Sequence, residues 1–369
     1  MRKLLFKKIL NKAKTIQSDP ILRSWLIGRL LGRWEGEPPY KAHHPPYLSD
    51  LLPLSPESPT KQFFCLKTNK PITKLLLKLP CEAVILCPGD ENKLFALHFD
   101  DIETKLALHR FAWLSEFGEN VPTDWVAAIW QAWVKKYSRV DNSWAWHPYT
   151  VAERAVNIIS FIERYGIPGS VEQTLNILKI HALAIINRLE YFGDHHTSNH
   201  LANNGRGLYL LGLALGLKQT TNIGGRILIE EAKRIFHSSG ILREGSSHYH
   251  LLLARNFKEV ADAAKKYNRK EEISLKSVAN KARRAAKHLI LPGGFPLIGD
   301  ISPDLAPDLL LKTMRLIKPK YQPSTRELNI FQEAGWYRKD YGPFSTLWHA
   351  APEGWSQMPG HGHQDTGSF

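Results

Sequence analysis

The 369-residue sequence predicts a mainly α-helical protein, with a small β element before the helices and the start of a β-rich domain after them. From residue 103 onward, apolar residues recur every three or four positions, which is the period of helices with one buried face. Before this stretch, short apolar runs alternate with turn residues, and after it the runs become short and aromatic. These patterns divide the chain into residues 1–59, 60–102, 103–320 and 321–369.

Residues 1–59 combine a basic helical segment with a proline-rich linker. Lysines and arginines interrupt every apolar run before residue 35, so no signal peptide or membrane span is expected, and the literal expectation is a cytoplasmic protein. A solvated helix is favoured over a peripheral membrane anchor. Proline and serine then crowd residues 36–60, which predicts an irregular linker. In residues 60–102, three runs predict strands, "KQFFCLK", "EAVILCPGD" and "KLFALHF".

The region 103–320 contains a series of amphipathic segments joined by short turns. In residues 171–193, apolar side chains recur at Val171, Leu175 and Leu178, and Gly193 stands where a helix would stop. Such helical hairpins pack as a bundle, a solenoid or a closed ring. In residues 321–369, "FQEAGWYRK", "FSTLWHA" and "DTGSF" predict strands that are too few for a sandwich with its own core. We therefore expect that the domain is truncated, or that these strands pack on the helices.

The charge and the cysteines narrow the classes of function. Lysine and arginine number 49 against 35 aspartates and glutamates, and the net charge of +14 favours a polyanionic partner such as nucleic acid, an anionic membrane or an acidic polysaccharide. Three cysteines without CxxC spacing provide neither a disulfide framework nor a cysteine zinc site. Glycine patterns such as "PGGFPLIGD" lack the order that nucleotide binding needs.

Three polar clusters could carry chemistry: "DHHTSNHLANNGRG" at 194–207, "REGSSHYHLL" at 243–252 and "GHGHQD" at 360–365. Histidine and asparagine between apolar helices are costly to bury without partners, so the first cluster predicts either helix capping or a site. In the second cluster, we expect Ser246 or Ser247 to be the N-cap of a helix. Tyr249 fits either a half-buried packing residue or a residue of an active site. The aromatic run "WAWHPYTVAER", which includes Trp146, fits either a core or a platform for sugar rings.

The order of these motifs resembles the heparinase II/III family of polysaccharide lyases over residues 103–369. The succession runs from "WHPYTVAERAVNIISFI" through "SNHLANNGRGLYLLGLALG", "EGSSHYHLL" and "GFPLIGD" to "AGWYRKD" and "GHGHQDTGSF". The resemblance implies an incomplete (α/α) toroid of helical hairpins, followed by the beginning of a β-sandwich domain. It also implies that the closing histidine motif reaches into the cleft of the toroid.

Roles for individual residues follow from the resemblance. Asn199 and His200 would bind or neutralise a uronate carboxylate, and Tyr249 would act as base and acid. His361 would be a second catalytic histidine. No cofactor would be required for the chemistry, although His363 would correspond to a ligand of a structural zinc. Further contacts to substrate are expected from the same clusters, at Trp146, Asn203, Arg243, Glu244 and His248.

The implied reaction is β-elimination at a uronic acid in an acidic polysaccharide. An unperturbed tyrosine has a pKa near ~10, so Tyr249 would need positive charge nearby, from His248, His361 or Arg243, to act as base. The alternative is a non-catalytic, basic helical protein that binds an anionic glycan or nucleic acid. The basic stretches fit solvated helix faces better, so nucleic acid is disfavoured and membrane contact is peripheral at most. A metallohydrolase is disfavoured because HExxH is absent. Family analogy would place the protein in the periplasm or at the cell surface.

Overall fold

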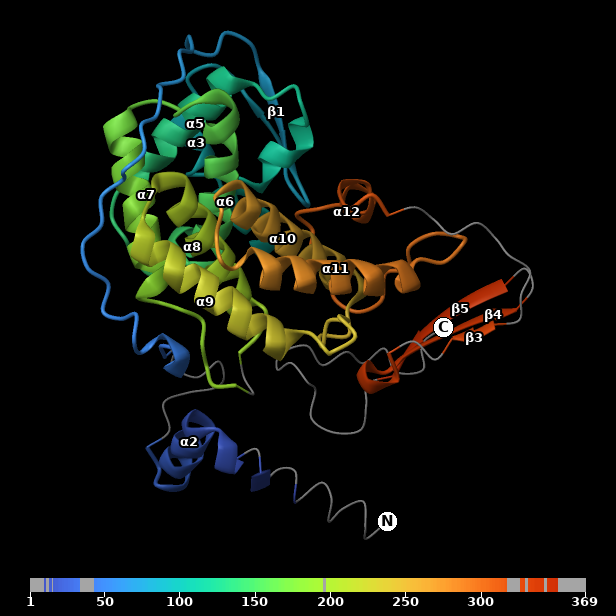
Figure 1. Cartoon of the computed structure of the whole chain (residues 1–369). Helices are drawn as coiled ribbons and strands as arrows, with labels where there is room; N and C mark the ends of the chain where they lie inside the picture. Colours follow the sequence, from blue (N-terminus) through green and yellow to red (C-terminus); the bar gives the residue numbers. More distant parts are fainter. Residues whose placement is uncertain are drawn as a thin grey trace.

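The computed structural model describes residues 10, 13–14, 16–33, 43–194, 197–316, 326–328, 331–341 and 344–350. Helices make up most of this part, and two small antiparallel sheets lie at its edges (Figure 1). The main helices, with the labels of Figure 1, are α2 (Pro20–Leu30), α3 (Glu91–Leu94), α4 (Ile102–Arg110), α5 (Thr123–Lys136), α6 (Pro148–Tyr165), α7 (Val171–Ile186), α8 (His200–Leu215), α9 (Lys218–Ile235), α10 (Ser247–Lys266), α11 (Glu272–Leu289) and α12 (Pro307–Thr313). Short 3₁₀ turns are η1 (Pro46–Leu48), η2 (Ala112–Phe117), η3 (Trp144–Trp146) and η4 (Gln332–Ala334).

The helical part agrees with the prediction from periodicity. Each amphipathic segment predicted between residues 103 and 320 contains one of the helices α4 to α12, which confirms a mainly α fold. Polar residues at the helix starts explain several of the boundaries. The carboxylate of Asp101 accepts from the main chain of Thr104 at 2.6 Å, and the hydroxyl of Ser246 accepts from the main chain of Tyr249 at 3.0 Å. These side chains satisfy N–H groups that a first turn leaves open, and Ser246 is one of the two predicted caps.

Glycines let α8 pack closely between α6 and α9. A Cβ added at Gly207 would lie 2.7 Å from the Cβ of Ala152 in α6, and one at Gly212 would lie 2.7 Å from the main-chain nitrogen of Thr221 in α9. Any larger residue would push these helices apart. The glycines of "NNGRGLYLLGLALG" therefore fix the position of α8, and with it the polar residues at its start.

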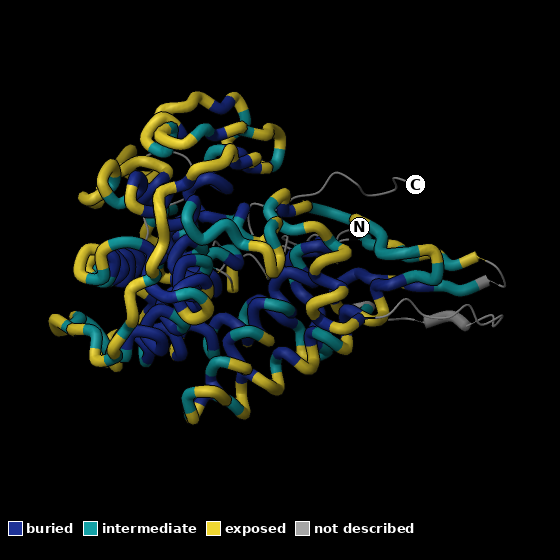
Figure 2. Tube along the Cα trace, turned by 90° about the horizontal axis from the view of Figure 1, so that it is seen from above, coloured by how far each residue is buried: buried dark blue, intermediate teal, exposed yellow. Residues whose placement is uncertain are grey.

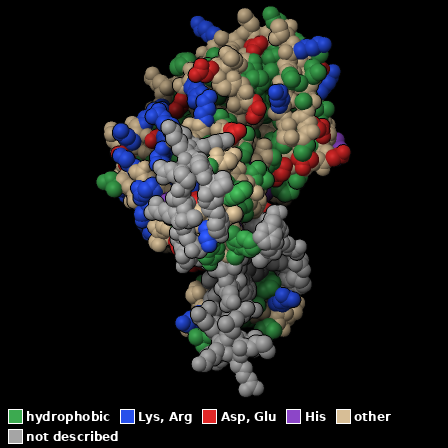
Figure 3. Space-filling view, turned by 90° about the vertical axis from the view of Figure 1, so that its right-hand side faces the viewer, with side chains coloured by type: hydrophobic (Ala, Val, Ile, Leu, Met, Phe, Trp, Pro, Cys, Tyr) green, Lys and Arg blue, Asp and Glu red, His purple; other side chains and the backbone are tan. Residues whose placement is uncertain are grey.

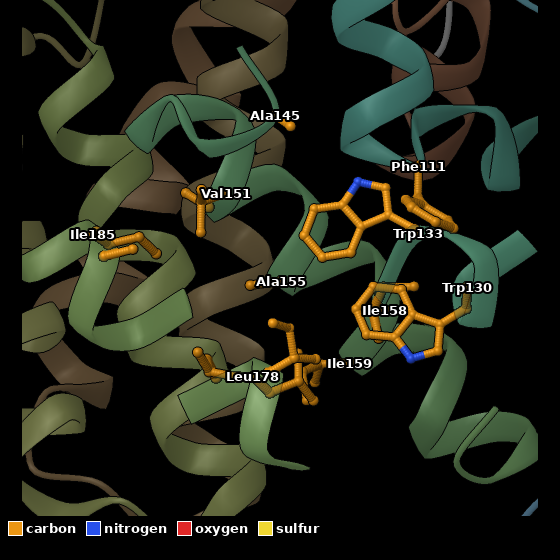
Figure 4. Close-up of a cluster of buried hydrophobic side chains, with 14 of the residues drawn as sticks. Phe111, Trp130, Trp133, Ala145, Val151, Ala155, Ile158, Ile159, Leu178 and Ile185 are labelled. Carbon is orange, nitrogen blue, oxygen red and sulfur yellow. The ribbon is translucent and has the colours of Figure 1, made fainter. Parts of the chain in front are cut away.

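The main core lies where α5, α6 and α7 meet. Trp130 and Trp133 of α5 stack with their ring centroids 5.6 Å apart, and both are fully buried. Figure 4 shows them beside Ile158 and Ile159 of α6. A second apolar cluster joins α9, α10 and α11, and the buried stretches in Figure 2 follow these packed helices. The cores make the helical part rigid enough to position side chains from several segments.

The first sheet is a hairpin of β1 (Leu75–Lys78) and β2 (Ala83–Leu86). The strand predicted in "EAVILCPGD" is β2, whereas the other two predictions for 60–102 are wrong. "KQFFCLK" makes only an isolated bridge from Cys65 to Ile167, and "KLFALHF" enters a helix, α3. The buried Leu94 and Phe95 sit on a helical turn rather than alternating along a strand. In contrast, burial along β1 alternates residue by residue, which is the period of a strand.

The second sheet has the order β3 (Arg326–Leu328), β4 (Trp336–Tyr341) and β5 (Phe344–His349). The fully buried Trp336 shares an apolar cluster with Ala285 and Leu289 of α11, so the sheet is attached to the helical part. The strand predicted in "DTGSF" lies outside the described residues. The predicted domain boundaries stay predictions. Within the described part of the chain, no helix has both the length and the apolar character needed to cross a membrane.

Candidate active site

The starts of α8 and α10 bring the first two predicted polar clusters together. The side-chain amide of Asn199, the residue before α8, donates to a carboxylate oxygen of Glu244 at 2.6 Å, although the two residues are 45 positions apart in sequence. Both side chains are buried. Tyr249 lies in the first turn of α10 and is half-buried. Asn199, His200, Glu244 and Tyr249 therefore belong to one polar cluster, which we call the site cluster.

A buried carboxylate holds the histidine of this cluster. Glu190 accepts from His200 at 2.9 Å and lies 3.7 Å from the Nε2 atom of His147. The side chain of Asn204 donates to its second oxygen at 2.9 Å. The side chain of Glu190 is 7% exposed, against 42% for His200 and 35% for His147. The acid thus lies behind two imidazoles that reach solvent.

The pair of Glu190 and His200 favours the charged form of both groups. Burial disfavours the imidazolium, but the negative charge of Glu190, its hydrogen bond and the charge of Glu244 outweigh this and raise the pKa of His200. Burial likewise opposes ionisation of Glu190, yet the charge of His200 lowers its pKa. At His147, burial dominates and lowers the pKa. The imidazole of His200 therefore carries a positive charge more readily than that of His147.

Tyr149 and Arg110 form the next layer of the site. The ring of Tyr149 packs against that of His200 in a tilted arrangement with centroids 4.6 Å apart, and the guanidinium of Arg110 lies 5.0 Å from the centroid of the Tyr149 ring. Arg110 also donates to Asp304 at 2.7 Å and to Glu103 at 3.0 Å. None of these residues, nor Glu190, was predicted from the sequence.

Tyr249 is a protonated phenol in this arrangement. Burial raises its pKa, the negative charges of Glu244 and Glu103 raise it further, and the positive charge of Arg110 opposes them. Among the described residues, Arg110 is the cation whose charge acts on this phenol, in place of the predicted His248 and Arg243. The third predicted cation, His361, lies outside the described residues. In this state Tyr249 can donate a proton more easily than it can remove one.

The placement of His248 corrects the prediction that it contacts substrate. Its side chain is fully buried, its Nδ1 atom accepts from the main chain of Ser302 at 2.9 Å, and its Nε2 atom donates to the main-chain oxygen of Leu305 at 2.9 Å. Ser246 donates to the oxygen of Asp300 at 2.6 Å, and Ser247 to that of Pro296 at 2.8 Å. The motif "SSHYH" thus fastens the loop 296–305 to α10.

Trp146 also requires a correction. Its side chain has no exposed surface and packs in the core, 5.7 Å from the ring of Trp133, so it offers no face to a sugar. Trp144, two residues earlier, is 45% exposed and lies 5.4 Å from the ring of His147. Trp144 therefore presents an exposed aromatic ring next to His147, which shares Glu190 with His200.

Asn203 and Arg243 lie beside the cluster. Asn203 is 3% exposed, and its side chain reaches the main-chain oxygen of Tyr149 at 3.5 Å and Arg206 at 3.4 Å. A role in substrate binding stays a prediction for Asn203 and for Glu244. Arg243 lines a groove between α9 and α11 instead.

The predicted catalytic His361 and the predicted zinc ligand His363 lie outside the described residues. Among the described residues, no three histidine, cysteine, aspartate or glutamate side chains form a group that could hold a metal ion. The β part nevertheless approaches the site. A Cβ added at Gly245 would lie 2.6 Å from the Cε1 atom of His349, the last residue of β5.

Comparisons with known proteins agree with this architecture. Residues 92–293 match the model of a protein family described as heparinase II/III N-terminus. A crystal structure of heparinase III is 17% identical, with a TM-score of 0.51 over 69% of this chain and 46% of that chain, which supports a shared fold. A crystal structure of heparan sulfate lyase HepC from Pedobacter heparinus is 17% identical and has a TM-score of 0.44. The match covers 74% of this chain and 49% of that chain. The chain thus spans about half the length of these structures. No curated protein matches the sequence.

Proposed function

The chain belongs to the heparinase II/III family, and from this premise we propose that it is a polysaccharide lyase that cleaves a uronate-containing acidic polysaccharide by β-elimination. One observation carries the proposal. Asn199 and His200 at the start of α8, the latter on its buried carboxylate, meet the phenol of Tyr249 from the start of α10 in one cluster. This set combines two groups that can neutralise a carboxylate with a proton donor.

In the proposed reaction, Asn199 and His200 bind the uronate carboxylate. Removal of the proton at C5 puts additional negative charge on this carboxylate, and hydrogen bonds from fixed donors stabilise the charge as it develops. The charged imidazole that Glu190 favours is suited to this task. One N–H of the Asn199 amide is held by Glu244, which fixes the direction of the other.

Tyr249 then serves as the general acid. When a base takes the C5 proton, the electrons of that bond form the C4–C5 double bond, the bond from C4 to the glycosidic oxygen breaks, and Tyr249 protonates the departing oxygen. The resemblance implied that Tyr249 acts as both base and acid, and its raised pKa favours the acid role. The resemblance gives the base role to Tyr249 as well and gives His361 as a second catalytic histidine, and both of these roles stay predictions. No cofactor enters this scheme, and zinc binding by His363 stays a prediction as well.

The surface of the protein fits an acidic glycan. The net charge is +14, and Figure 3 shows Lys and Arg side chains grouped along one side of the helical body. Such a potential attracts a polyanion and increases its encounter rate. The exposed ring of Trp144 supplies a flat apolar surface beside the site cluster, of the kind on which a sugar ring can stack.

Product analysis on matched glycans tests the proposal. The protein is incubated with heparan, chondroitin, hyaluronan and alginate, each in native form and with its uronate carboxyls reduced to alcohols. We expect at least one native glycan to give products with the ultraviolet absorbance of a C4–C5 double bond and a mass one water below that of hydrolysis products. The reduced glycan should give none, because the group that acidifies C5 is gone.

Other outcomes would contradict the proposal in different ways. Cleavage of both forms to saturated products would indicate a hydrolase. Binding that weakens steeply with salt, without any product, would indicate the non-catalytic alternative of a basic protein that binds anionic glycan.

A further inference from the structure

A groove between α9 and α11 lies apart from the site cluster. Figure 1 shows the two helices as neighbours, and the groove between them has a volume of about 470 Å³. The turn at residues 237–240 closes one end. A Cβ added at Gly240 would lie 2.7 Å from the main-chain oxygen of Lys281, so only glycine allows this turn to approach α11 so closely. The end wall is therefore built into the backbone.

Apolar side chains form a stripe along the groove. Its members are Ile229 and Ala232 of α9, Phe236 directly after this helix, and Leu275 and Val278 of α11. Ile229 and Val278 are partly exposed, and the other three form a buried floor. From Ile229 to the end of α9 at Ile235 the helix rises about 9 Å, so the stripe has the length of a medium alkyl chain. A sugar would lose hydrogen bonds with water over such a surface, whereas a hydrocarbon tail would gain from burial.

Positive charge gathers at the polar edge. Lys233, Arg243 and Lys281 line the groove, and its lining residues include no aspartate or glutamate. Glu333 lies near His237 and Ser239 in the turn at the end of the groove. Lys233 pairs with Glu230 at 2.8 Å. Within the described residues, neither Arg243 nor Lys281 forms an ion pair, and the Nε atom of Arg243 is buried without an acceptor. An unpaired guanidinium that is half removed from water is unfavourable, and an anion in the groove would relieve this cost.

We propose that this groove binds a single-chain amphiphilic anion, with a carboxylate or phosphate head on Arg243 and Lys281 and an alkyl tail along the apolar stripe. The head group meets the donors that the protein leaves without acceptors, and the tail covers the partly exposed Ile229 and Val278 above the buried floor. Arg243 and Glu244 are adjacent in sequence, yet Glu244 binds Asn199 while Arg243 lines the groove. The two sites are thus distinct, and the groove does not depend on the proposed lyase activity.

Calorimetric titration of the full chain tests this site. The probes are octyl phosphate and octanoate, which share the tail, with inorganic phosphate and octanol as the separated head and tail. We expect at least one of the two amphiphiles to bind about tenfold more tightly than either separated part, since the charge-assisted hydrogen bonds of the head and the burial of the tail both contribute to its affinity. The stronger amphiphile identifies the head group.

Variants locate the binding. Lys281→Ala, at an exposed position, and Arg243→Gln should each weaken binding of the better amphiphile by about tenfold. Lys276→Ala, an exposed lysine on the other side of α11, is the matched control and should leave binding unchanged, as should Tyr249→Phe. Absence of amphiphile binding at millimolar concentration would overturn the proposal. The proposal would also be overturned if inorganic phosphate bound as tightly as the better amphiphile. The same holds if Lys281→Ala and Arg243→Gln both left amphiphile binding unchanged.

Discussion

His200 at the start of α8 belongs to the site cluster and His248 at the start of α10 directly precedes its Tyr249, but the surroundings of the two rings differ. The His200 ring reaches solvent on one side and a buried carboxylate on the other. The ring of His248 is fully buried, and both of its nitrogens bind main-chain groups of the loop 300–305. His250 repeats the second pattern, because it accepts from the main chain of Leu242 at 3.2 Å and lies 3.0 Å from the oxygen of Ala282.

The difference shows that the partner of a histidine, rather than its place in a motif, decides its role. A carboxylate raises the pKa of His200, whereas burial lowers that of His248 and lowers that of His250 to about 4. The first ring can carry a positive charge toward a substrate. The other two remain neutral and hold the backbone in place.

The largest expected effect on activity comes from removing the imidazole ring of His200, at the start of α8. We expect His200→Ala to lower kcat/KM for elimination by about 10²–10³-fold, because a donor aimed at the developing charge is lost. Its melting temperature should fall only modestly, since the ring is partly exposed and the buried Glu190 keeps its hydrogen bond from Asn204. Initial rates and a thermal melt on the same preparation measure both quantities. Unchanged rates would remove His200 from the proposed mechanism.

The matching change at α10 should act on stability instead. His248→Ala leaves the N–H of Ser302 and the C=O of Leu305 without their partner, and we expect a loss of about 2–4 kcal/mol in the free energy of unfolding. Urea unfolding measures the loss. His98→Ala, at a ring that is 90% exposed, is the control and should change little. If His248→Ala is as stable as this control, the structural role of His248 is wrong.

Glu190→Gln tests why His200 is charged. The raised pKa of His200 means that the imidazolium persists below this pKa and is lost as the pH rises through it. Without the carboxylate the pKa falls, so the alkaline limb of the kcat/KM profile should move to lower pH. Activity should therefore fall more at pH 8 than at pH 6. A profile that keeps its shape would contradict the assigned role of Glu190.

The smallest expected effect concerns the sugar platform. Trp144→Ala should raise KM by about fivefold with little change in kcat, since stacking on an exposed ring is worth about 1 kcal/mol. The control is Phe344→Ala, an aromatic residue on β5 that is 71% exposed. Equal KM values for Trp144→Ala and the parent would rule out a platform at this position.

Local patterns in the sequence were sufficient to predict the helices between residues 103 and 320 and one of their N-caps. Periodicity and flanking glycines act over neighbouring residues, so α4 to α12 and the cap at Ser246 could be predicted. The strand errors have a similarly local cause. The apolar run at Leu94 and Phe95 is too short for its period to separate a strand from a helical turn.

The site was only partly predictable, because its remaining contacts join distant segments. The polar motifs indicated Asn199, His200 and Tyr249, whose catalytic roles are proposals. Glu190 could have been noticed as the only acidic residue in 173–193, directly before the histidine-rich loop. Arg110 gave no such signal, because its partners Asp304 and Tyr149 meet it only in the folded chain. Sequence also cannot show which face of a turn is buried, which is why Trp146 was preferred over Trp144.

The most direct test of the central claim is the rate of ultraviolet absorbance increase from the unsaturated uronate, measured for the parent, Tyr249→Phe and Tyr267→Phe on the same glycan. The phenol of Tyr267 binds Glu163 near the far end of α10, so its loss should leave the rate unchanged. We expect Tyr249→Phe to be about 10²–10⁴-fold slower than the parent with the same melting temperature, since it lacks the general acid. An absorbance increase that Tyr249→Phe leaves at the parental rate would contradict the account.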